Sequence, residues 1–227
     1  MMKQITQSLV MIMHPAQPFL EWIVELGAHL ANEKDHPPAD TDELTNITAV
    51  FIYKNPDLSK FNEFLMTHSE TLLRHEFSRW TKNKALWPLR NDVEMLLDYF
   101  RVELYDNIVD FRENATDVSR IAILRPTIKL KTWLKSVLTA IGENTAEIDF
   151  TSPNSFQSVS TALFLPETVK TISESVKFIQ NQYTALFDYE LNRYIADEKF
   201  WPEKRSSELF AEWFELDLYA KPYVLKS

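Results

Sequence analysis

The chain repeats its own sequence, and this repeat constrains the fold more than any other feature of the 227 residues. Residues 87–105 align with residues 201–219 without gaps at an offset of 114, and six of the nineteen positions are identical. At average composition about one identity is expected by chance. The identical pairs are Trp87/Trp201, Pro88/Pro202, Glu94/Glu208, Phe100/Phe214, Leu104/Leu218 and Tyr105/Tyr219.

Three further segments match in the same order along the chain. Residues 10–22, 48–52 and 76–80 align with residues 121–133, 161–165 and 190–194, at offsets of 111, 113 and 114. The small differences between these offsets arise in polar segments, where loops accept insertions. We therefore predict a tandem duplication, with repeat one at residues 1–113 and repeat two at residues 114–227.

Each repeat contains the same series of predicted elements. An apolar run of strand length ends at Pro15 or Pro126, because proline disfavours helix at the residue before it. Next come an amphipathic helix containing Trp22 or Trp133, a polar stretch with room for a short strand, for which residues 147–150 are the better candidate, and a β-branched strand. A long helix, a Trp-Pro break, a short helix and a last strand at 102–111 or 216–225 complete the repeat.

The predicted order β-α-β-β-α-α-β is typical of an α+β fold with helices on one face of a sheet. Our best topology is a ferredoxin-like split β-α-β unit with one additional helix. Two such repeats in a pseudo-twofold arrangement would imitate the dimer of a single-copy ancestor. The two glycines, Gly27 and Gly142, are expected to cap the first helix of each repeat.

Several motifs resemble a family of small bacterial domains of unassigned function. The resemblance rests on the tryptophan of the first helix, the strand end Leu165-Pro166-Glu167, and the pairs Trp201-Pro202 and Trp213-Phe214. Repeat two fits better than repeat one, which has Tyr53-Lys54-Asn55 and Tyr99-Phe100 instead. These motifs are structural, and the resemblance implies no activity.

Composition excludes several classes of function. With two glycines and no cysteine, the chain has no glycine-rich phosphate loop, disulfide, zinc thiolate or thiol nucleophile, and we expect no cofactor. The net charge of −9 disfavours binding to nucleic acid or to an anionic membrane. Repeat one has 11 basic and 18 acidic residues, against 13 and 15 in repeat two. This asymmetry suits a basic partner, although solubility alone also explains it.

The N-terminus has too short an apolar run for a secretory signal, and no stretch of the sequence is long and apolar enough for a membrane span. We expect a cytoplasmic protein that does not bind a membrane. Its oligomeric state is left open.

Few polar residues occur at matching positions of both repeats. Glu76 and Arg79, like Glu190 and Arg193, are three residues apart in a predicted helix, which favours an ion pair within the helix. Alternatively, each arginine binds an anionic ligand, and all four residues, Glu76, Arg79, Glu190 and Arg193, are candidate ligand-binding residues. Glu103 and Asp217 form another shared pair of acidic positions.

The five histidines, His14, His29, His36, His68 and His75, all lie in repeat one. None falls in a metal-binding motif, so we predict no metal site. His14 matches Arg125 at the end of the first strand, a common ligand position, and both are candidate ligand-binding residues. We find no catalytic motif.

The shared features concern packing more than chemistry, and so we predict a non-enzymatic interaction module, such as an inhibitor or immunity-type protein with a basic partner. The alternative is a small-molecule binder or an enzyme that uses a cleft between the repeats. A structural, oligomerising protein is a third hypothesis.

Overall fold

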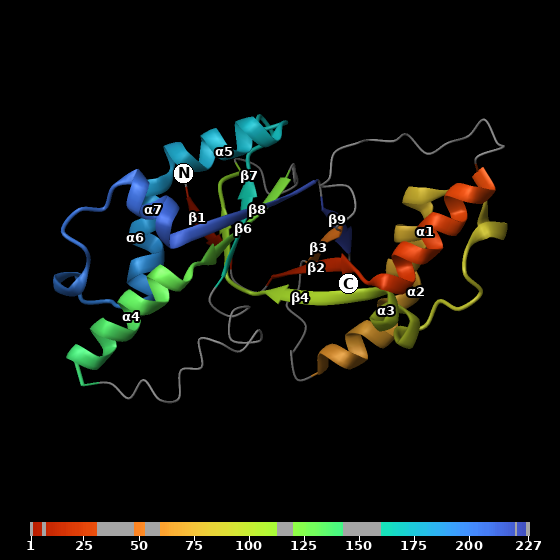
Figure 1. The fold of residues 1–227 in the computed structure, drawn as a ribbon, viewed down its shortest axis with the longest axis horizontal. Helices are drawn as coiled ribbons and strands as arrows, with labels where there is room; N and C mark the ends of the chain where they lie inside the picture. The colour runs from red at the N-terminus through yellow and green to blue at the C-terminus, as the bar shows by residue number, and fades with distance from the viewer. Residues whose placement is uncertain are drawn as a thin grey trace. The chain divides into compact units, whose positions relative to one another are not determined.

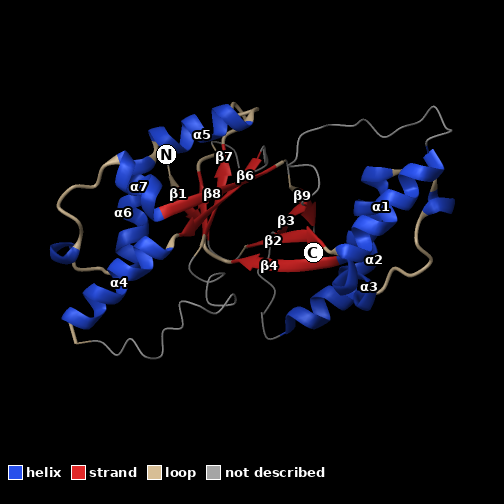
Figure 2. Cartoon of the chain, in the orientation of Figure 1, coloured by secondary structure: helices blue, strands red, loops and turns tan. Residues whose placement is uncertain are grey.

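The computed structural model describes residues 2–5, 8–30, 48–52, 60–112, 120–142, 160–220 and 222–225. The fold is α+β, as predicted (Figures 1 and 2). The chain divides into two compact units. Unit 1 comprises residues 1–6 and 105–222, and unit 2 comprises residues 7–104 and 223–227. The chain therefore passes from one unit to the other after residues 6, 104 and 222.

Unit 2 contains a four-stranded sheet in the order β4-β2-β3-β9. Its strands are β2 (Leu9–Pro15), β3 (Thr48–Ile52), β4 (Phe100–Tyr105) and β9 (Tyr223–Leu225). Its helices are α1 (Gln17–Leu30), α2 (Phe61–Trp80), the 3-10 helix η3 (Lys84–Leu86) and α3 (Val93–Tyr99). One buried core joins strands and helices, and Phe19 lies in it within 4.5 Å of the Phe100 ring centroid.

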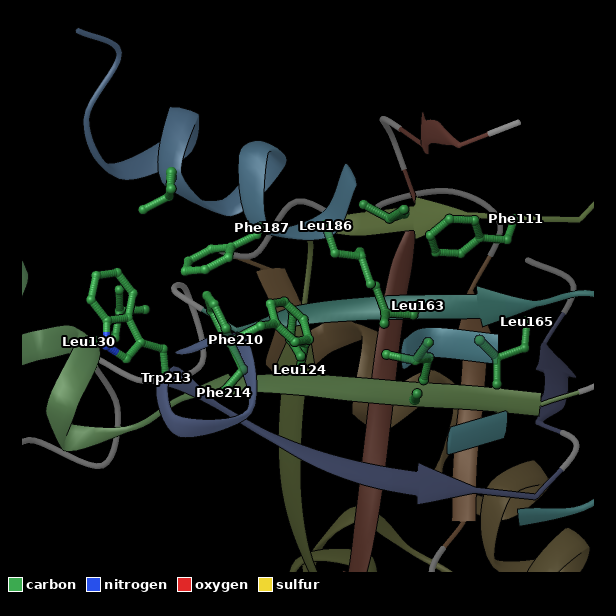
Figure 3. Close-up of a cluster of buried hydrophobic side chains, with 14 of the residues drawn as sticks. Phe111, Leu124, Leu130, Leu163, Leu165, Leu186, Phe187, Phe210, Trp213 and Phe214 are labelled. Atoms are coloured by element: carbon green, nitrogen blue, oxygen red, sulfur yellow. The ribbon is translucent and has the colours of Figure 1, made fainter. Parts of the chain in front are cut away.

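Unit 1 contains a five-stranded sheet in the order β1-β5-β7-β6-β8. Its strands are β1 (Lys3–Ile5), β5 (Ile108–Asp110), β6 (Arg120–Pro126), β7 (Thr161–Leu165) and β8 (Phe214–Tyr219). Its helices are α4 (Ile128–Ala140), α5 (Ile172–Asn181), α6 (Tyr183–Tyr194), the 3-10 helix η5 (Glu198–Phe200) and α7 (Ser207–Trp213). Figure 3 shows its core, where Phe187, Phe210, Trp213 and Phe214 from the helices and β8 meet Leu124 and Leu163 from the sheet.

Local sequence accounts for most element boundaries. The strands β2 and β6 end at Pro15 and Pro126, which confirms the predicted effect of proline. The side chains of Asp92 and Ser206 cap α3 and α7 by accepting hydrogen bonds from the backbone of the first turn. Gly142 follows α4 with a φ of 82°, as a C-terminal cap requires. Gly27 lies inside α1, so the capping role predicted for it is wrong.

The last strand of each repeat differs from the prediction, because it is broken into two. The predicted strand at 102–111 is β4 and β5, separated by Asp106 and Asn107, and the strand at 216–225 is β8 and β9. The long helix predicted after residue 169 is likewise two helices, α5 and α6, which meet at Gln182. The candidate short strand at 147–150 lies outside the described residues.

The unit 1 sheet contains two strands from repeat one, β1 and β5, and the unit 2 sheet contains one strand from repeat two, β9. β5, which belongs to repeat one, pairs parallel with β7, so that Val109 lies opposite Leu163. β9, at the end of repeat two, pairs parallel with β3, so that Tyr223 lies opposite Val50. The exchange is reciprocal. The division between residues 113 and 114 concerns the sequence repeats and stays a prediction. The boundaries of the compact units lie at other residues.

The pairing pattern leaves the ferredoxin-like topology unconfirmed. A β-α-β unit joins parallel strands through its helix. Here the strands joined by the first helix of each repeat are antiparallel neighbours, β2 with β3 and β6 with β7. The parallel pairs of both sheets come from the exchanged strands instead.

The exchange makes a prediction about stability. Leu225 of β9 is buried in the core of unit 2, so Leu225→Ala should lower the free energy of unfolding of this unit by about 2–4 kcal/mol. Hydrogen exchange followed by mass spectrometry should show faster exchange in β2 and β3. Exchange in β6 and β7 should stay unchanged, although these strands belong to the same sequence repeat as Leu225. Faster exchange confined to β6 and β7 would contradict the observed pairing.

Candidate functional site

The polar residues shared by the repeats form a buried cluster in unit 1. Thr161 is the first residue of β7, and Glu190 and Arg193 lie one turn apart on α6. Arg193 Nη1 lies 2.8 Å from Glu190 Oε2 and 2.9 Å from Thr161 Oγ1, and the Thr161 hydroxyl donates to Glu190 Oε1. Glu190 is 1% exposed. A buried carboxylate needs such partners, because an unpaired one is costly to desolvate.

The strand exchange adds Asn107 to this cluster. Asn107 lies between β4 and β5, and its side-chain amide donates to Thr161 Oγ1. The Tyr189 hydroxyl donates to Asn107 Oδ1 at 2.6 Å, and the Asn107 carbonyl accepts from the backbone of Ala162. We call Asn107, Thr161, Tyr189, Glu190 and Arg193 the unit 1 polar cluster. Repeat one thus supplies a hydrogen-bonding residue to the polar centre of repeat two.

Unit 2 contains the matching cluster with one difference. Arg79 Nη1 lies 2.9 Å from Glu76 Oε2 and donates to the hydroxyl of Thr48, the first residue of β3. Glu76 is 1% exposed, yet its Oε1 has no hydrogen-bond partner among the described residues, and neither has Trp80 Nε1 one turn away. In unit 1 the counterpart of Trp80 is Tyr194, whose hydroxyl is hydrogen-bonded to Glu190. The unit 2 carboxylate is therefore less completely satisfied.

Burial controls the protonation of both clusters. Desolvation raises the pKa of Glu190 and of Glu76, and the adjacent arginine opposes this rise in each unit. Burial also raises the pKa of Tyr194, which keeps its hydroxyl protonated as a donor. In each unit the cluster thus joins a helix to a strand around a buried glutamate.

The arginine side chains are engaged within the clusters. Arg79 and Arg193 bind the adjacent glutamate and threonine, which fits the ion pair predicted from their spacing. Their side chains are still about a quarter exposed, at 27% and 22%. Ligand binding by these arginines and glutamates stays a prediction.

The candidate residues His14 and Arg125 each lie beside an acidic residue of the last strand. His14 Nε2 is 3.2 Å from Glu103 Oε2 in unit 2, and Arg125 Nε pairs with Asp217 in unit 1. A basic residue of β2 or β6 therefore lies beside an acidic residue of β4 or β8 in each unit. Arg125 also lies over the Tyr105 ring, 5.5 Å from its centroid. Ligand binding by His14 or Arg125 stays a prediction as well.

Sequence reasoning missed a buried ion pair on the exchanged strand of unit 1. Arg112 Nε and Nη2 bind the two carboxylate oxygens of Asp110 at 2.7 and 2.9 Å, and the guanidinium lies over the Phe164 ring. Asp110, Arg112 and Asn107 match Val224, Lys226 and Lys221 of repeat two. Because the repeats do not share these residues, a comparison of the repeats does not identify them. An Asp-Phe-Arg run directly after an apolar strand is the only local signal.

The Trp-Pro dipeptides fix the turn after the long helix in both units. Trp87 Nε1 donates to the carbonyl of Thr81 at 3.1 Å, and Trp201 Nε1 donates to that of Ile195 at 2.7 Å. Both rings pack against the hydrophobic core of their unit. Their contacts are those of a structural tryptophan.

A second feature of interest is the exposed surface of α1 and α3 in unit 2. α1 exposes Glu21, Val24 and Glu25 on one face, and α3 exposes Leu97 and Asp98. Val24 is 73% and Leu97 51% exposed. Glu25 and Asp98 both raise the pKa of Tyr99, in addition to its burial, so the carboxylates of the two helices lie near one hydroxyl group. We call these five residues, Glu21, Val24, Glu25, Leu97 and Asp98, the α1–α3 surface.

The corresponding helices of unit 1 balance their charges. α4 carries Lys129, Lys131 and Lys135, and α7 carries Glu208 and Glu212. Lys129 Nζ lies 3.0 Å from Glu212 Oε2, which joins the two helices. The positions of Val24 and Leu97 are taken by Lys135 and Ala211. At these two positions unit 1 therefore has a basic and a small side chain in place of the apolar ones of unit 2, although α4 exposes Ile128 at its first position.

The described residues contain no group of three or more histidine and acidic side chains that could hold a metal ion. His68 packs on Phe64 and His75 stacks on Tyr223, with ring centroids 4.5 and 4.0 Å apart. His29 is exposed on α1, and His36 lies outside the described ranges. In the same described part of the chain, no helix has the length and apolarity needed to cross a membrane.

Comparisons with known proteins return no match. Neither protein-family models, nor curated proteins, nor solved structures resemble this chain significantly. The resemblance to small bacterial domains of unassigned function therefore stays a prediction.

The unit 1 polar cluster predicts an asymmetric response to substitution of Glu190. Glu190→Ala leaves the Arg193, Thr161 and Tyr194 donors without their acceptor, and should destabilise unit 1 by about 3–5 kcal/mol. Glu190→Gln keeps an acceptor oxygen and the side-chain volume, so its effect should be clearly smaller. Urea denaturation of both variants measures the difference. Equal losses would show that the carboxylate is not held as described.

His75 predicts a pH dependence of stability in unit 2. Burial, and then Arg79 and Lys82, lower its pKa from 6.5 to about 4. A lowered histidine pKa means that the unfolded chain binds more protons between these values, so its contribution to stability is lost as the pH falls from about 6.5 to 4. His75→Phe keeps the ring contact with Tyr223 and removes the titration.

Thermal unfolding between pH 7 and pH 4 should therefore show a smaller loss of stability in the His75→Phe variant than in the unchanged chain. The pKa of Glu76 is raised, which acts in the opposite direction, but this group is present in both proteins and its effect cancels in the comparison. Parallel pH profiles for the two proteins would contradict the prediction.

Proposed function

We propose that the chain is a non-enzymatic interaction module, built from two duplicated α+β repeats, that binds a basic protein through the α1–α3 surface of unit 2. The observation that carries this proposal is the contrast between matching surfaces of the same chain. Where unit 1 joins its two helices by the Lys129–Glu212 ion pair, unit 2 presents carboxylates on both helices around the exposed side chains of Val24 and Leu97.

The duplication is supported by contacts that recur in both halves. Three contacts of repeat one recur 111–114 residues later: the threonine–glutamate–arginine cluster, the contact of a basic with an acidic residue on neighbouring strands, and the tryptophan of the Trp-Pro turn. These recurring contacts hold helices to strands. They support a shared scaffold, on which the surfaces have diverged.

Charge favours a basic partner. Like charges on adjacent helices repel each other, and they cost stability unless a partner compensates them. Among the described residues, no ion pair joins Glu25 or Asp98 to a basic side chain. Lysine or arginine side chains of a partner would be attracted to these carboxylates. Covering Val24 and Leu97 would also remove apolar area from water. An inhibitor or immunity-type protein works through such a surface.

The proposal predicts that partner binding follows the α1–α3 surface. Replacing Val24 by lysine and Leu97 by alanine installs the residues of unit 1 and should weaken binding at least tenfold, since two apolar contacts of about 1 kcal/mol each are lost. The matched control is Lys135→Val with Ala211→Leu, which changes the same positions of unit 1 and should leave binding intact. Co-purification from the source cells, quantified by mass spectrometry and then repeated with the purified partner, measures both.

Salt provides an independent check on the electrostatic part. Binding should weaken as the salt concentration rises from about 0.05 to 0.5 M, because exposed charges are screened. Asp98→Asn should reduce this dependence. A partner that binds the unit 2 and unit 1 variants equally, with no effect of salt, would refute the proposal.

A further inference from the structure

The exchanged strands of the two sheets have different surroundings. In unit 1, β5 lies between β7 and β1, so both of its edges are paired. In unit 2, the corresponding strand β9 pairs with β3 on one edge and ends the sheet on the other (Figure 2). Within the described part of the chain, no strand stands beside β9 where β1 stands beside β5.

The correspondence between β5 and β9 is fixed by their neighbours. Val109 lies opposite Leu163, and Tyr223 lies opposite Val50, and these two partners occupy matching positions of β7 and β3. Residue 223 therefore matches residue 109. The outer edge of β9 is thus the counterpart of the edge that β1 covers in unit 1.

Burial agrees with an open edge. All three residues of β5 are buried, whereas Tyr223 and Val224 of β9 are partly exposed. An edge strand presents backbone N–H and C=O groups that a further strand can pair with. Adding a strand to such an edge is a common way to recognise an extended peptide.

We propose that the outer edge of β9 is a docking site for an extended segment of a partner protein, which adds antiparallel to Tyr223–Leu225 as a fifth strand of the unit 2 sheet. The antiparallel direction of the added segment is inferred from β1, which runs antiparallel to β5 at the corresponding edge of the unit 1 sheet. Pro222 stands where β5 has Ile108 and lacks an N–H group, so backbone pairing starts at Tyr223.

The side chains define what kind of segment fits. In unit 1, Lys3 of β1 lies opposite Asp110, and the position matching Asp110 in β9 is Val224. A lysine opposite Val224 finds no carboxylate there, so the site favours a β-branched or aromatic residue at this point. The occupant is therefore an extended segment with an apolar residue where β1 has lysine.

The sequence of the chain itself offers a weaker occupant. Residues 113–116 precede β6 as residues 2–5 precede β2, but they carry Glu113 and Thr116 where the first segment has Met2 and Ile5. The asparagine and alanine between them are depleted in strands. A partner segment with β-branched residues is thus the stronger candidate for this edge.

The test uses the full chain and a synthetic peptide with the sequence of residues 1–8, in which valine replaces Lys3. Hydrogen exchange followed by mass spectrometry reports on Tyr223–Leu225. We expect these amides to exchange at least tenfold more slowly with saturating peptide, since new backbone hydrogen bonds protect them. The peptide with the original lysine should bind roughly two- to fivefold more weakly.

A matched pair of peptides tests the backbone pairing without changing the protein. One is N-methylated at the second residue and the other at the third, so that only one of the two methyl groups points toward β9. One peptide should lose protection of the edge and the other should keep it. Equal behaviour of the two would overturn the proposal.

Two further results would also overturn it. Protection at residues 223–225 that is already as strong in the free chain as at residues 108–110 means that the chain covers its own edge. No protection at about 1 mM peptide, a concentration that suits weak strand addition, means that the edge does not accept a strand. Hydrogen exchange at residues 223–225 does not report on the α1–α3 surface, so either proposal can fail without the other.

Discussion

The structure depends on the parallel pairing of two three-residue strands with sheets of the opposite repeat. β5 inserts Val109 into the core of unit 1, and β9 inserts Leu225 into the core of unit 2. A strand this short gains little from local interactions and is held by tertiary packing. Because each core contains a side chain from the other repeat, neither repeat has a complete core on its own. Each sequence repeat therefore depends on a strand of the other to complete its core.

The exchange also shapes the polar interior. Asn107 enters the unit 1 polar cluster only because β4 continues into β5 across the boundary between units. In unit 2 the exchanged strand instead brings Tyr223 onto the ring of His75. The exchanged segment therefore contributes a hydrogen-bonded amide to unit 1 and an aromatic contact to unit 2.

Local features of the sequence predicted most helices and strands, but they did not predict which strands pair across the two repeats. The prolines at 15 and 126, the tryptophan helices and the glutamate–arginine spacing act over a few residues and could be identified from the sequence. β1 and β9 are too short to show a periodicity, and the sequence does not encode their partners in any local pattern. The ferredoxin-like topology assumed that each repeat completes its own sheet. Comparing the repeats found shared residues but passed over Asn107 and Arg112, which one copy alone contains.

The differences between the copies point in one direction. Unit 1 closes each feature within the chain: β1 covers the edge of β5, Lys129 neutralises Glu212, and Tyr194 satisfies Glu190. Unit 2 lacks the counterpart of each among the described residues, with an edge at β9, carboxylates on both α1 and α3, and Glu76 Oε1 without a donor. An unsatisfied buried polar atom also occurs in unit 1, at Arg120 Nη1, so this feature alone does not distinguish the units. The edge at β9 and the carboxylates of α1 and α3 do distinguish them, and they are what we expect if unit 1 provides the scaffold and unit 2 meets partners.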